Sequence, residues 1–395
     1  MKIALFTDTY HPQVNGVVSF LESITPVLAK EHEVLVFAPG DAKKIEKKRL
    51  ARNVVIYWIP ASPFPFYEGY KVSSVMLRQI WQILRKENVS VVHAHAPVLL
   101  GLQGMLAAKR LGIPVVATYH THYPDYLPYI VNGKLPNFLK PLSDRTVKGL
   151  IRLVFSLADC STAPTEELAT ELRTYKVKNV AVLPNGIDLK SLKTSKRIES
   201  DFRKRYGIKS KKIILFVGRM GFEKRLDVVL ASLKKLKNKD WCFLAVGKGP
   251  ELERYEKAAE EFGENAVFCG FLENDVLHAA YGCADLFVSA SDSETFGLTF
   301  IEAMAFGLPA IGVNKLGAKE IIKNGMNGFV IRPGDSTAMA KKIDLLLNDN
   351  ALRARMGKEA KKTAKCYSIE ESARKSVEIY RDLVSEQLKK GHRNV

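Results

Sequence analysis

The stretch ADLFVSASDSETFGLTFIEAMAFGLPAIGVN, residues 284–314, decides the fold. It opens with the short apolar run ADLFVSAS and closes with PAIGVN, and the segment that starts at FGL has a helical pattern. Short, continuous apolar runs are typical of strands buried on both faces, as in a parallel sheet covered by helices. The stretch therefore predicts a strand, a loop, a helix and a second strand parallel to the first.

The same alternation of apolar runs and helical patterns extends over the rest of the chain. In the first half the runs are KIALFT, EVLVFAP, VVIYWIP, VVHAHA, VVATYH, CSTAP and VAVLPNG. In the second half they include KIILFVG, WCFLAVG, AVFCGF and GFVIRPG. Because 395 residues are also too many for one ordinary core, we predict an α/β protein with two doubly wound, Rossmann-like domains, residues 1–190 and 191–377.

Two further segments belong to neither series of strands. The polar, lysine-rich stretch from Lys190 to Ser200 separates the two sets of strands and is predicted to be a linker. The tail that starts at Ser368 has the pattern of a single helix, with Ser368 and Glu371 spaced as a capping box.

Composition and charge narrow the class of protein. With 47% hydrophobic and 26% charged residues, the chain is typical of a soluble globular protein. The net charge of +18 indicates an anionic partner, which can be a nucleotide phosphate, an acidic lipid or a nucleic acid. Five cysteines without a C-x-x-C pair are expected to be reduced core residues, and the start MKIALFTDTY lacks the features of a signal peptide. Both observations favour a cytoplasmic protein.

Glu294 and Glu302 flank the start of the predicted helix. On a helical path they would lie about 12 Å apart, which exceeds the roughly 5 Å of the carboxylate pair in a retaining glycosidase. Free backbone N–H groups at the helix start favour phosphate. The stretch thus offers a carboxylate, an anion site and a second carboxylate, which match the sugar, the diphosphate and the ribose of a sugar nucleotide. The alternative is that both are ordinary helix charges.

Two other loops carry groups that suit phosphate. Arg219 follows the strand KIILFVG, and Lys224 lies five residues later near a helix start. Two cations at the end of a parallel strand suit a diphosphate, although a solvated basic turn has the same composition. Gly16 follows the first strand, where its backbone allows an anion to approach, and a plain turn is the alternative there.

Two His-x-His pairs, His93 with His95 and His120 with His122, occur at strand ends. Alternate residues of a strand share a face, so the pairs are compatible with zinc, with catalysis or with packing. No cysteine or acidic ligand stands beside them and no D-x-D pair occurs in this stretch, so we expect no bound metal and no cofactor.

Together, these patterns resemble the retaining glycosyltransferases of family 4. The resemblance rests on E-x7-E, on VGR with EK after it, and on PNGID (184–188), GKGPELE (247–253) and YHPQVNGV (10–17). It covers essentially the whole chain in order. It implies the GT-B fold, in which two Rossmann-like domains face each other across a cleft. It further implies that the C-terminal domain binds a nucleotide-sugar, the N-terminal domain binds the acceptor, and helix 378–395 packs on the N-terminal domain.

The resemblance also assigns roles to individual residues. It gives His120, Glu294, Arg219 and Lys224 to the catalytic site. It implies that Glu302 binds the ribose, that Glu294 binds the donor sugar, and that Arg219 and Lys224 bind the diphosphate. The remaining donor contacts that it implies are Gly16, Phe271, Phe296, Gly297 and Leu298.

The acceptor is predicted from the Tyr-rich segment YHTHYPDYLPYI, residues 119–130. The segment resembles its counterpart in diacylglycerol glucosyltransferases, which implies a lipid acceptor in contact with His122, Tyr123 and Tyr126, and glucose supplied by a UDP-sugar. From Lys134 to Arg152 the chain then carries five basic residues and one acid among Leu, Phe and Val. That mixture suits an anionic membrane surface at the cytoplasmic face, or equally a buried helix with a solvated basic face.

Three other functions share some of these features. A family 4 transferase that acts on a soluble sugar or polyol fits the same donor residues. A nucleotide-sugar epimerase has the same architecture but lacks E-x7-E with the Arg and Lys pair. A nucleic-acid partner is not expected, because no binding module is recognised and the basic residues are spread along the chain.

Overall fold

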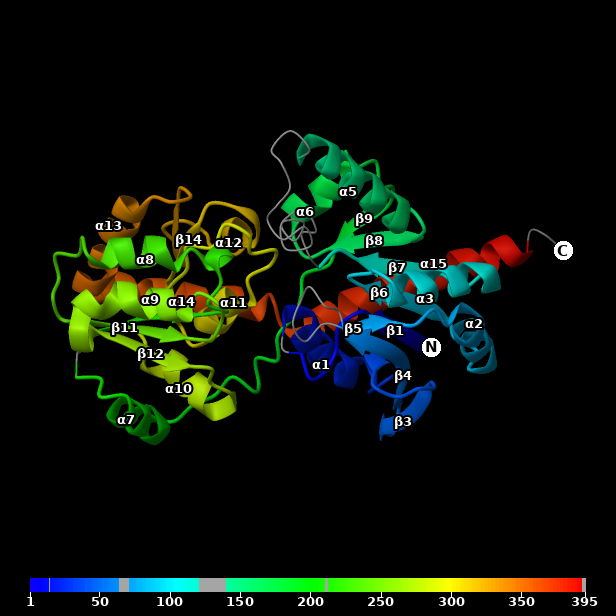
Figure 1. Ribbon diagram of the computed structural model, residues 1–395, viewed down its shortest axis with the longest axis horizontal. Coiled ribbons are helices and arrows are strands. Elements are labelled where there is room, and N and C mark those ends of the chain that lie inside the picture. Colours follow the sequence, from blue (N-terminus) through cyan, green and yellow to red (C-terminus); the bar gives the residue numbers. More distant parts are fainter. Residues whose placement is uncertain (14, 64–70, 121–139, 210–211, 393–395) are drawn as a thin grey trace. The chain divides into compact units, whose positions relative to one another are not determined.

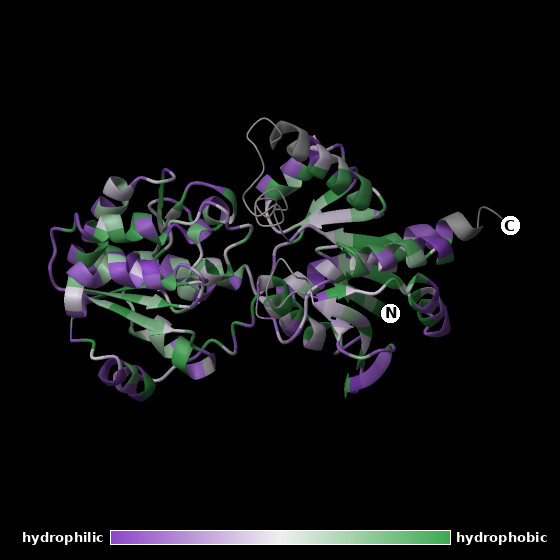
Figure 2. Ribbon diagram, in the orientation of Figure 1, coloured by the Kyte–Doolittle hydropathy of each residue, from purple (hydrophilic) through white to green (hydrophobic). Residues whose placement is uncertain are grey.

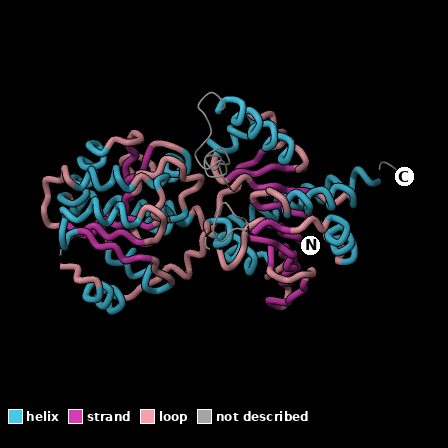
Figure 3. The backbone as a smooth tube through the Cα atoms, in the orientation of Figure 1, coloured by secondary structure: helices cyan, strands magenta, loops and turns pink. Residues whose placement is uncertain are grey.

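The computed structural model describes residues 1–13, 15–63, 71–120, 140–209 and 212–392 (Figure 1). Contacts divide the chain into an N-terminal unit, Met1–Gly186 with Ile369–Val395, and a C-terminal unit, Ile187–Ser368. Each unit has its own sheet (Figure 3). The predicted boundaries at 190 and 377 differ from these because the last helix, α15 (Ile369–His392), is continuous from Ile369. Ile369 and Ala373 are already buried in the N-terminal core.

The N-terminal sheet has the strand order β3-β4-β2-β1-β6-β7-β8-β9, with β5 paired to β4. Its pairs are parallel except for those of β3 and β5, which run antiparallel to β4. The apolar runs form strands because both of their faces are buried. The strands are β1 (Lys2–Thr7), β2 (Glu33–Gly40), β3 (Glu46–Ala51), β4 (Val54–Pro63), β5 (Lys71–Ser73), β6 (Val91–His95), β7 (Val115–Thr118), β8 (Cys160–Ala163) and β9 (Val180–Val182).

Helices cover both faces of this sheet. Alternate residues of β1 show the division: Ile3 and Leu5 lie in one core cluster with residues of α1 (Gly16–Leu28) and α15. Phe6 points to the other face, where it lies against Gly104 of α3 (Leu100–Leu111). The other helices of the unit are α2 (Leu77–Lys86), α5 (Lys140–Phe155) and α6 (Glu166–Thr174).

The C-terminal sheet is parallel throughout its described pairs and has the order β12-β11-β10-β13-β14-β15. This order reverses direction between β10 and β13, as in a dinucleotide-binding fold. Its strands are apolar in Figure 2, in contrast to the hydrophilic β3. They are β10 (Lys212–Val217), β11 (Trp241–Val246), β12 (Ala266–Gly270), β13 (Leu286–Val288), β14 (Ala310–Val313) and β15 (Gly328–Ile331).

Two helical layers sandwich this sheet as well. Ile214 and Phe216 of β10 share one cluster with α8 and α13, and Ile213 and Leu215 share the other with α10 and α11. The helices are α7 (Lys196–Arg205), η2 (Phe222–Lys224), α8 (Leu226–Leu233), α9 (Leu252–Ala259), η3 (Glu260–Asn265), α10 (Asn274–Cys283), α11 (Leu298–Ala305), α12 (Leu316–Ile321), α13 (Ser336–Asn348) and α14 (Asn350–Lys365).

Two expectations from the sequence were wrong in part. The predicted linker ends earlier than Ser200, because α7 begins at Lys196, where Ser195 caps the helix and Phe202 is buried. The cysteines are all free, but Cys366 is exposed rather than part of the core.

Candidate functional site

Three of the predicted donor residues of the C-terminal unit, Arg219, Lys224 and Glu294, lie in loops where the strand order reverses. Arg219 follows β10, Glu294 follows β13, and Lys224 ends η2. In an open parallel sheet, the loops at the carboxyl ends of the two strands that flank such a reversal form the usual ligand crevice. The fold therefore brings together residues that lie about seventy positions apart in the sequence.

Lys224 and Glu294 form an ion pair between the Nζ atom and Oε1. Both side chains are largely buried, at 21% and 17% exposure. The sequence predicted separate roles for them, a cation for the diphosphate and a carboxylate for the sugar. The contact places the two groups side by side, where they can bind adjacent parts of one ligand.

The loop between Glu294 and α11 has a fixed backbone. Gly297 has φ 87°, a left-handed conformation that favours glycine, and it is the N-cap residue of α11, directly after the buried Phe296. Gly317 donates its N–H to the Glu294 carbonyl at 2.9 Å. A Cβ on Gly317 would lie 2.2 Å from the Phe296 carbonyl oxygen, so only glycine fits there. The loop thus holds the first turn of α11 in one defined position, where the N–H of Phe300 already donates to the Gly297 carbonyl and the preceding N–H groups could face an anion.

Glu302 lies on α11 and is held by Tyr281 of α10. The Tyr281 hydroxyl donates to Oε2 of Glu302 at 2.6 Å. Burial raises the pKa of the Glu302 carboxyl, and the hydrogen bond from Tyr281 opposes that rise. Phe306 stacks on the Tyr281 ring at 5.5 Å and fixes it. The second carboxylate of the stretch is therefore oriented by a neighbour that the sequence did not reveal.

The two outlying donor residues have less distinctive surroundings. Phe271 directly follows β12 and is 47% exposed, so its ring is accessible to a planar base. Gly16 is the first residue of α1. Asn15 caps this helix by accepting hydrogen bonds from Val17 and Val18, which leaves fewer free N–H groups for a phosphate.

The N-terminal unit gathers three of the predicted histidines at the ends of β6 and β7. Nδ1 of His95 and Nε2 of His120 lie 2.9 Å apart. His93 instead hydrogen-bonds Tyr380 of α15 and Thr118 of β7, both at 2.6 Å. Burial lowers the pKa of His93 and His120 to about 3, and that of His95 well below its ordinary value. All three imidazoles are therefore neutral at pH 7.

These histidines are arranged for hydrogen bonding. Two nitrogen ligands of a tetrahedral zinc lie roughly 3.3 Å apart, given Zn–N bonds of about 2.0 Å. The His95–His120 distance of 2.9 Å is that of a direct hydrogen bond. In the described part of the chain, no group of three or more His, Cys, Asp or Glu side chains could hold a metal ion.

Asp8, directly after β1, was not among the site residues predicted from the sequence. Its carboxylate accepts four backbone N–H groups, from Val98, Leu99, Leu100 and Gly101, at 2.6–3.0 Å. These groups belong to the first turn of α3 and the loop before it. The strand end and the helix start are thereby held together beside the histidines.

The predicted acceptor residues His122, Tyr123 and Tyr126 lie outside the described ranges. The basic stretch that follows is described from α5 onward. Leu150 and Leu153 are exposed on this helix at 59% and 65%, whereas Phe155 is buried. Among the described helices, none has both the length and the apolar character to cross a bilayer.

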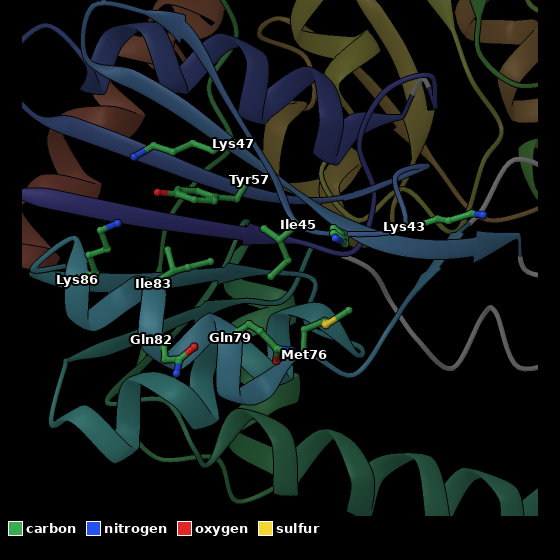
Figure 4. Close-up of a pocket in the computed structure, with 10 residues that line it drawn as sticks. Lys43, Ile45, Lys47, Tyr57, Met76, Gln79, Gln82, Ile83 and Lys86 are labelled. Atoms are coloured by element: carbon green, nitrogen blue, oxygen red, sulfur yellow. The ribbon is translucent and has the colours of Figure 1, made fainter.

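A hollow of about 520 Å³ lies elsewhere in the N-terminal unit (Figure 4). Lys47, one of its walls, is paired with Glu87 at 2.7 Å. The predicted site residues within the described ranges do not line it. Its lining is Lys43, Lys44, Ile45, Lys47, Tyr57, Met76, Gln79, Gln82, Ile83 and Lys86.

Three partners of the site were therefore missed: Tyr281, His95 as a partner of His120, and Gly317. Each acts through a contact between distant segments, such as the 21 residues between Tyr281 and Glu302. The sequence pattern KLGAKE around Gly317 offered one weak signal, a glycine three residues after the end of the predicted strand PAIGVN.

Comparisons with known proteins agree with this geometry. The family model described as Glycosyltransferase Family 4 matches residues 14–191, and the model described as Glycosyl transferases group 1 matches residues 198–363. The alpha-monoglucosyldiacylglycerol synthase of Streptococcus pneumoniae is 32% identical over 340 residues, which span 83% of this chain and 74% of that protein. The GDP-mannose-dependent alpha-mannosyltransferase of Corynebacterium glutamicum is 30% identical, over 84% of this chain and 76% of that protein.

A solved structure has the same fold. The crystal structure of HepE from Anabaena in complex with UDP superposes with a TM-score of 0.77, over 97% of this chain and 100% of that chain, at 18% identity. The prediction of a GT-B architecture with two Rossmann-like domains is confirmed. The chain therefore belongs to the glycosyltransferases that combine a family 4 N-terminal region with a group 1 C-terminal region.

Proposed function

We propose that the protein transfers a hexose, with retention at the anomeric carbon, from a nucleotide-sugar to a membrane lipid such as diacylglycerol. The observation that carries the transfer is the grouping of Lys224, Glu294, the start of α11 and Glu302 where the strand order reverses. A cation with backbone N–H groups suits a diphosphate, and a carboxylate on either side suits the hydroxyls of a sugar and a ribose.

The leaving group in this reaction is a nucleoside diphosphate. Arg219, Lys224 and the first turn of α11 stabilise the charge that develops on it as the anomeric bond breaks. Groups that act in this way contribute more in the transition state than in the ground state. Their removal therefore lowers turnover more than donor affinity.

His120 is proposed as the catalytic residue of the N-terminal unit. Its imidazole is neutral, because burial lowers its pKa to about 3. A neutral imidazole can accept or donate a hydrogen bond with a sugar hydroxyl. We propose that this contact orients the sugar in transfer, and that no bound metal is required.

The donor is proposed to be UDP-glucose. The similar protein of S. pneumoniae is named for glucosyldiacylglycerol synthesis, and HepE is bound to UDP, whereas the similar protein of C. glutamicum is named for GDP-mannose. The Tyr-rich segment 119–130, which resembles that of diacylglycerol glucosyltransferases, supports the first choice.

Peripheral binding to the cytoplasmic membrane face is proposed through α5. This helix exposes Leu150 and Leu153, and Arg145, Lys148 and Arg152 are exposed beside them. Each basic residue near an anionic surface contributes about 1 kcal/mol to the free energy of membrane binding. Exposed leucines contribute further by inserting into the apolar part of the membrane. Together they would hold the protein reversibly where a lipid acceptor is concentrated.

The transfer is tested with purified protein, UDP-glucose or GDP-mannose, and diacylglycerol in vesicles, with NMR of the product to establish the anomeric configuration. We expect an α-glucosyl lipid, unchanged activity with EDTA, and weaker nucleotide binding in Glu302→Ala. His120→Ala should lose roughly two orders of magnitude in rate. Glu256→Ala, on the exposed side of α9, is the matched control. Wild-type rate and affinity in both site variants would refute the assignment.

Membrane binding is tested by co-sedimentation with neutral and anionic vesicles at low and high salt. We expect binding to anionic vesicles that salt releases, and weaker binding of Leu150→Ser combined with Leu153→Ser. Faster transfer to a soluble sugar, with no response to anionic lipid, would refute the lipid acceptor and leave the transferase assignment intact.

A further inference from the structure

His95 and His120 form a direct contact between neighbouring strands. β6 and β7 are parallel, with His95 opposite Thr118, so the end of β6 lies beside the segment that carries His120. The two rings are 5.2 Å apart at an interplanar angle of 25°, and Phe20 of α1 packs against both. Only 1% of His95 and 5% of His120 is exposed. The contact is therefore sheltered from water.

Each of these rings has one nitrogen engaged and one without a partner. Nδ1 of His95 and Nε2 of His120 face each other, whereas Nε2 of His95 and Nδ1 of His120 have no hydrogen-bond partner among the described residues. His93, whose ring centroid is 3.9 Å from that of His95, differs because both of its nitrogens are engaged. Buried polar atoms are normally satisfied, so each of these two nitrogens is open to a partner outside the described residues, such as a substrate hydroxyl.

The contact restricts the protons of the pair. Burial lowers the pKa of both histidines far below neutrality, so the two neutral rings share two N–H protons among four nitrogens. A hydrogen bond between them requires one proton, and only one, in the middle. If His120 supplies it from Nε2, then His95 carries its own proton on Nε2. If His95 supplies it from Nδ1, then His120 carries its proton on Nδ1.

We propose that His95 is a positioning residue that couples the tautomer of His120 to its own, so that both rings are Nε2–H or both are Nδ1–H. The pair is then one unit with two states. A substrate hydroxyl that donates to Nδ1 of His120 selects the first state, and one that accepts selects the second. This role rests on the proposed catalytic function of His120, but the coupling itself is a property of the two rings.

The coupling is tested by two-bond 1H–15N correlation spectra of protein with 15N-labelled histidine, which distinguish the two tautomers of each ring. The chain has eight histidines, so single substitutions assign the signals. We expect matched tautomers for His95 and His120 at pH 7. Opposite tautomers would overturn the proposal, because they leave either two protons or none between the rings.

Two substitutions separate positioning from packing. His95→Asn places an amide group near the position of Nδ1 and keeps a bond to His120, whereas His95→Phe keeps the ring volume and removes the bond. Loss of the partner that orients a metal-bound histidine typically costs 10- to 100-fold, and we expect an effect of the same order for this buried pair. We expect kcat to fall by about that factor in His95→Phe with little change in the donor KM, and His95→Asn to recover most of it.

Tyr380→Phe is the matched control, because it removes a hydrogen bond to His93 and touches neither member of the pair. It should leave the tautomer of His120 unchanged. An unchanged His120 tautomer and kcat in His95→Phe would overturn the proposal. If His120→Ala is fully active while the tautomers are matched, the catalytic role fails and the coupling stands.

Discussion

Tyr281 donates its phenolic hydrogen to Oε2 of Glu302 at 2.6 Å, and this bond joins α10 to α11. Tyr281 is fully buried. Burial raises the pKa of the Glu302 carboxyl, and the phenol stabilises its charged form. The bond therefore favours the ionised form of Glu302, which is the form that the proposed ribose contact uses.

Removal of the Tyr281 hydroxyl should change the pH dependence of nucleotide affinity. In Tyr281→Phe the pKa of Glu302 should rise further, because its ionised form loses a donor while burial remains. A carboxylic acid accepts fewer hydrogen bonds than a carboxylate. As the pH is lowered, the UDP affinity of the variant should therefore begin to fall at a higher pH than that of the wild type. Titration calorimetry between pH 5 and 8 measures this shift. Identical pH profiles would show that Tyr281 only packs.

The ion pair of Lys224 and Glu294 should make their substitutions non-additive. Each side chain fixes the other, so Lys224→Met or Glu294→Gln alone disrupts both groups. We expect each single variant to lose roughly two orders of magnitude in kcat and the double variant to lose little more. The steady-state rates of all three variants provide the test. Losses that multiply in the double variant would mean that the residues act independently.

The strands could largely be predicted because their signal is local. β1 and β6 have apolar residues on both faces, and such runs are distinctive in a single sequence. β3 has the opposite composition, EKKRLA, and is exposed throughout. It is a strand because its backbone pairs with β4, and no pattern within the segment indicates that.

The sequence allowed single site residues to be predicted from their chemical type, but it did not predict which residues pair with them. Lys224, Glu294 and Glu302 stood out because charges beside a helix start suggest a ligand. Their partners depend on tertiary structure: 70 residues separate Lys224 from Glu294, and 25 separate His95 from His120. The boundary at Ile369 was equally hidden, since the apolar stripe of α15 does not identify the core that it joins.

His93 should contribute to acid sensitivity. Its folded pKa of about 3 lies below the ordinary value near 6.5. As the pH falls, His93 is therefore protonated in the unfolded chain at a higher pH than in the folded protein. The contribution of His93 to the free energy of unfolding is complete above about pH 6.5. It is lost as the pH falls, by roughly 2 kcal/mol between pH 7 and pH 5. Urea unfolding at both values should show a smaller loss for His93→Asn than for the wild type.

Tyr380→Phe serves as the control for this measurement. It weakens the surroundings of His93 and leaves the imidazole in place. Its stability should be lower at both pH values, with the same difference between them as in the wild type. An equal pH difference in His93→Asn and the wild type would contradict the account.

Asp8 should be important for stability, because one carboxylate satisfies four N–H groups around the start of α3. Asp8→Asn replaces an acceptor oxygen by an amide that opposes these donors. We expect a loss of about 2–4 kcal/mol in unfolding free energy, measured by urea denaturation. Asp41→Asn is the control, since its exposed carboxylate forms a surface ion pair with Lys71 and its loss should cost less than about 1 kcal/mol. Equal losses would refute the capping role.

Gly317 provides a test of whether the position of the loop before α11 determines donor binding. A methyl group there would lie 2.2 Å from the Phe296 carbonyl oxygen and 2.5 Å from its carbonyl carbon, so Gly317→Ala must displace the backbone between Glu294 and Gly297. A displacement of about 1 Å can cost on the order of 100-fold in rate. We expect UDP affinity and kcat both to fall. Gly149→Ala in α5 is the matched control, because its added methyl group meets nothing within 4 Å. Equal donor affinity and kcat in the two variants would show that the anion site does not depend on this contact.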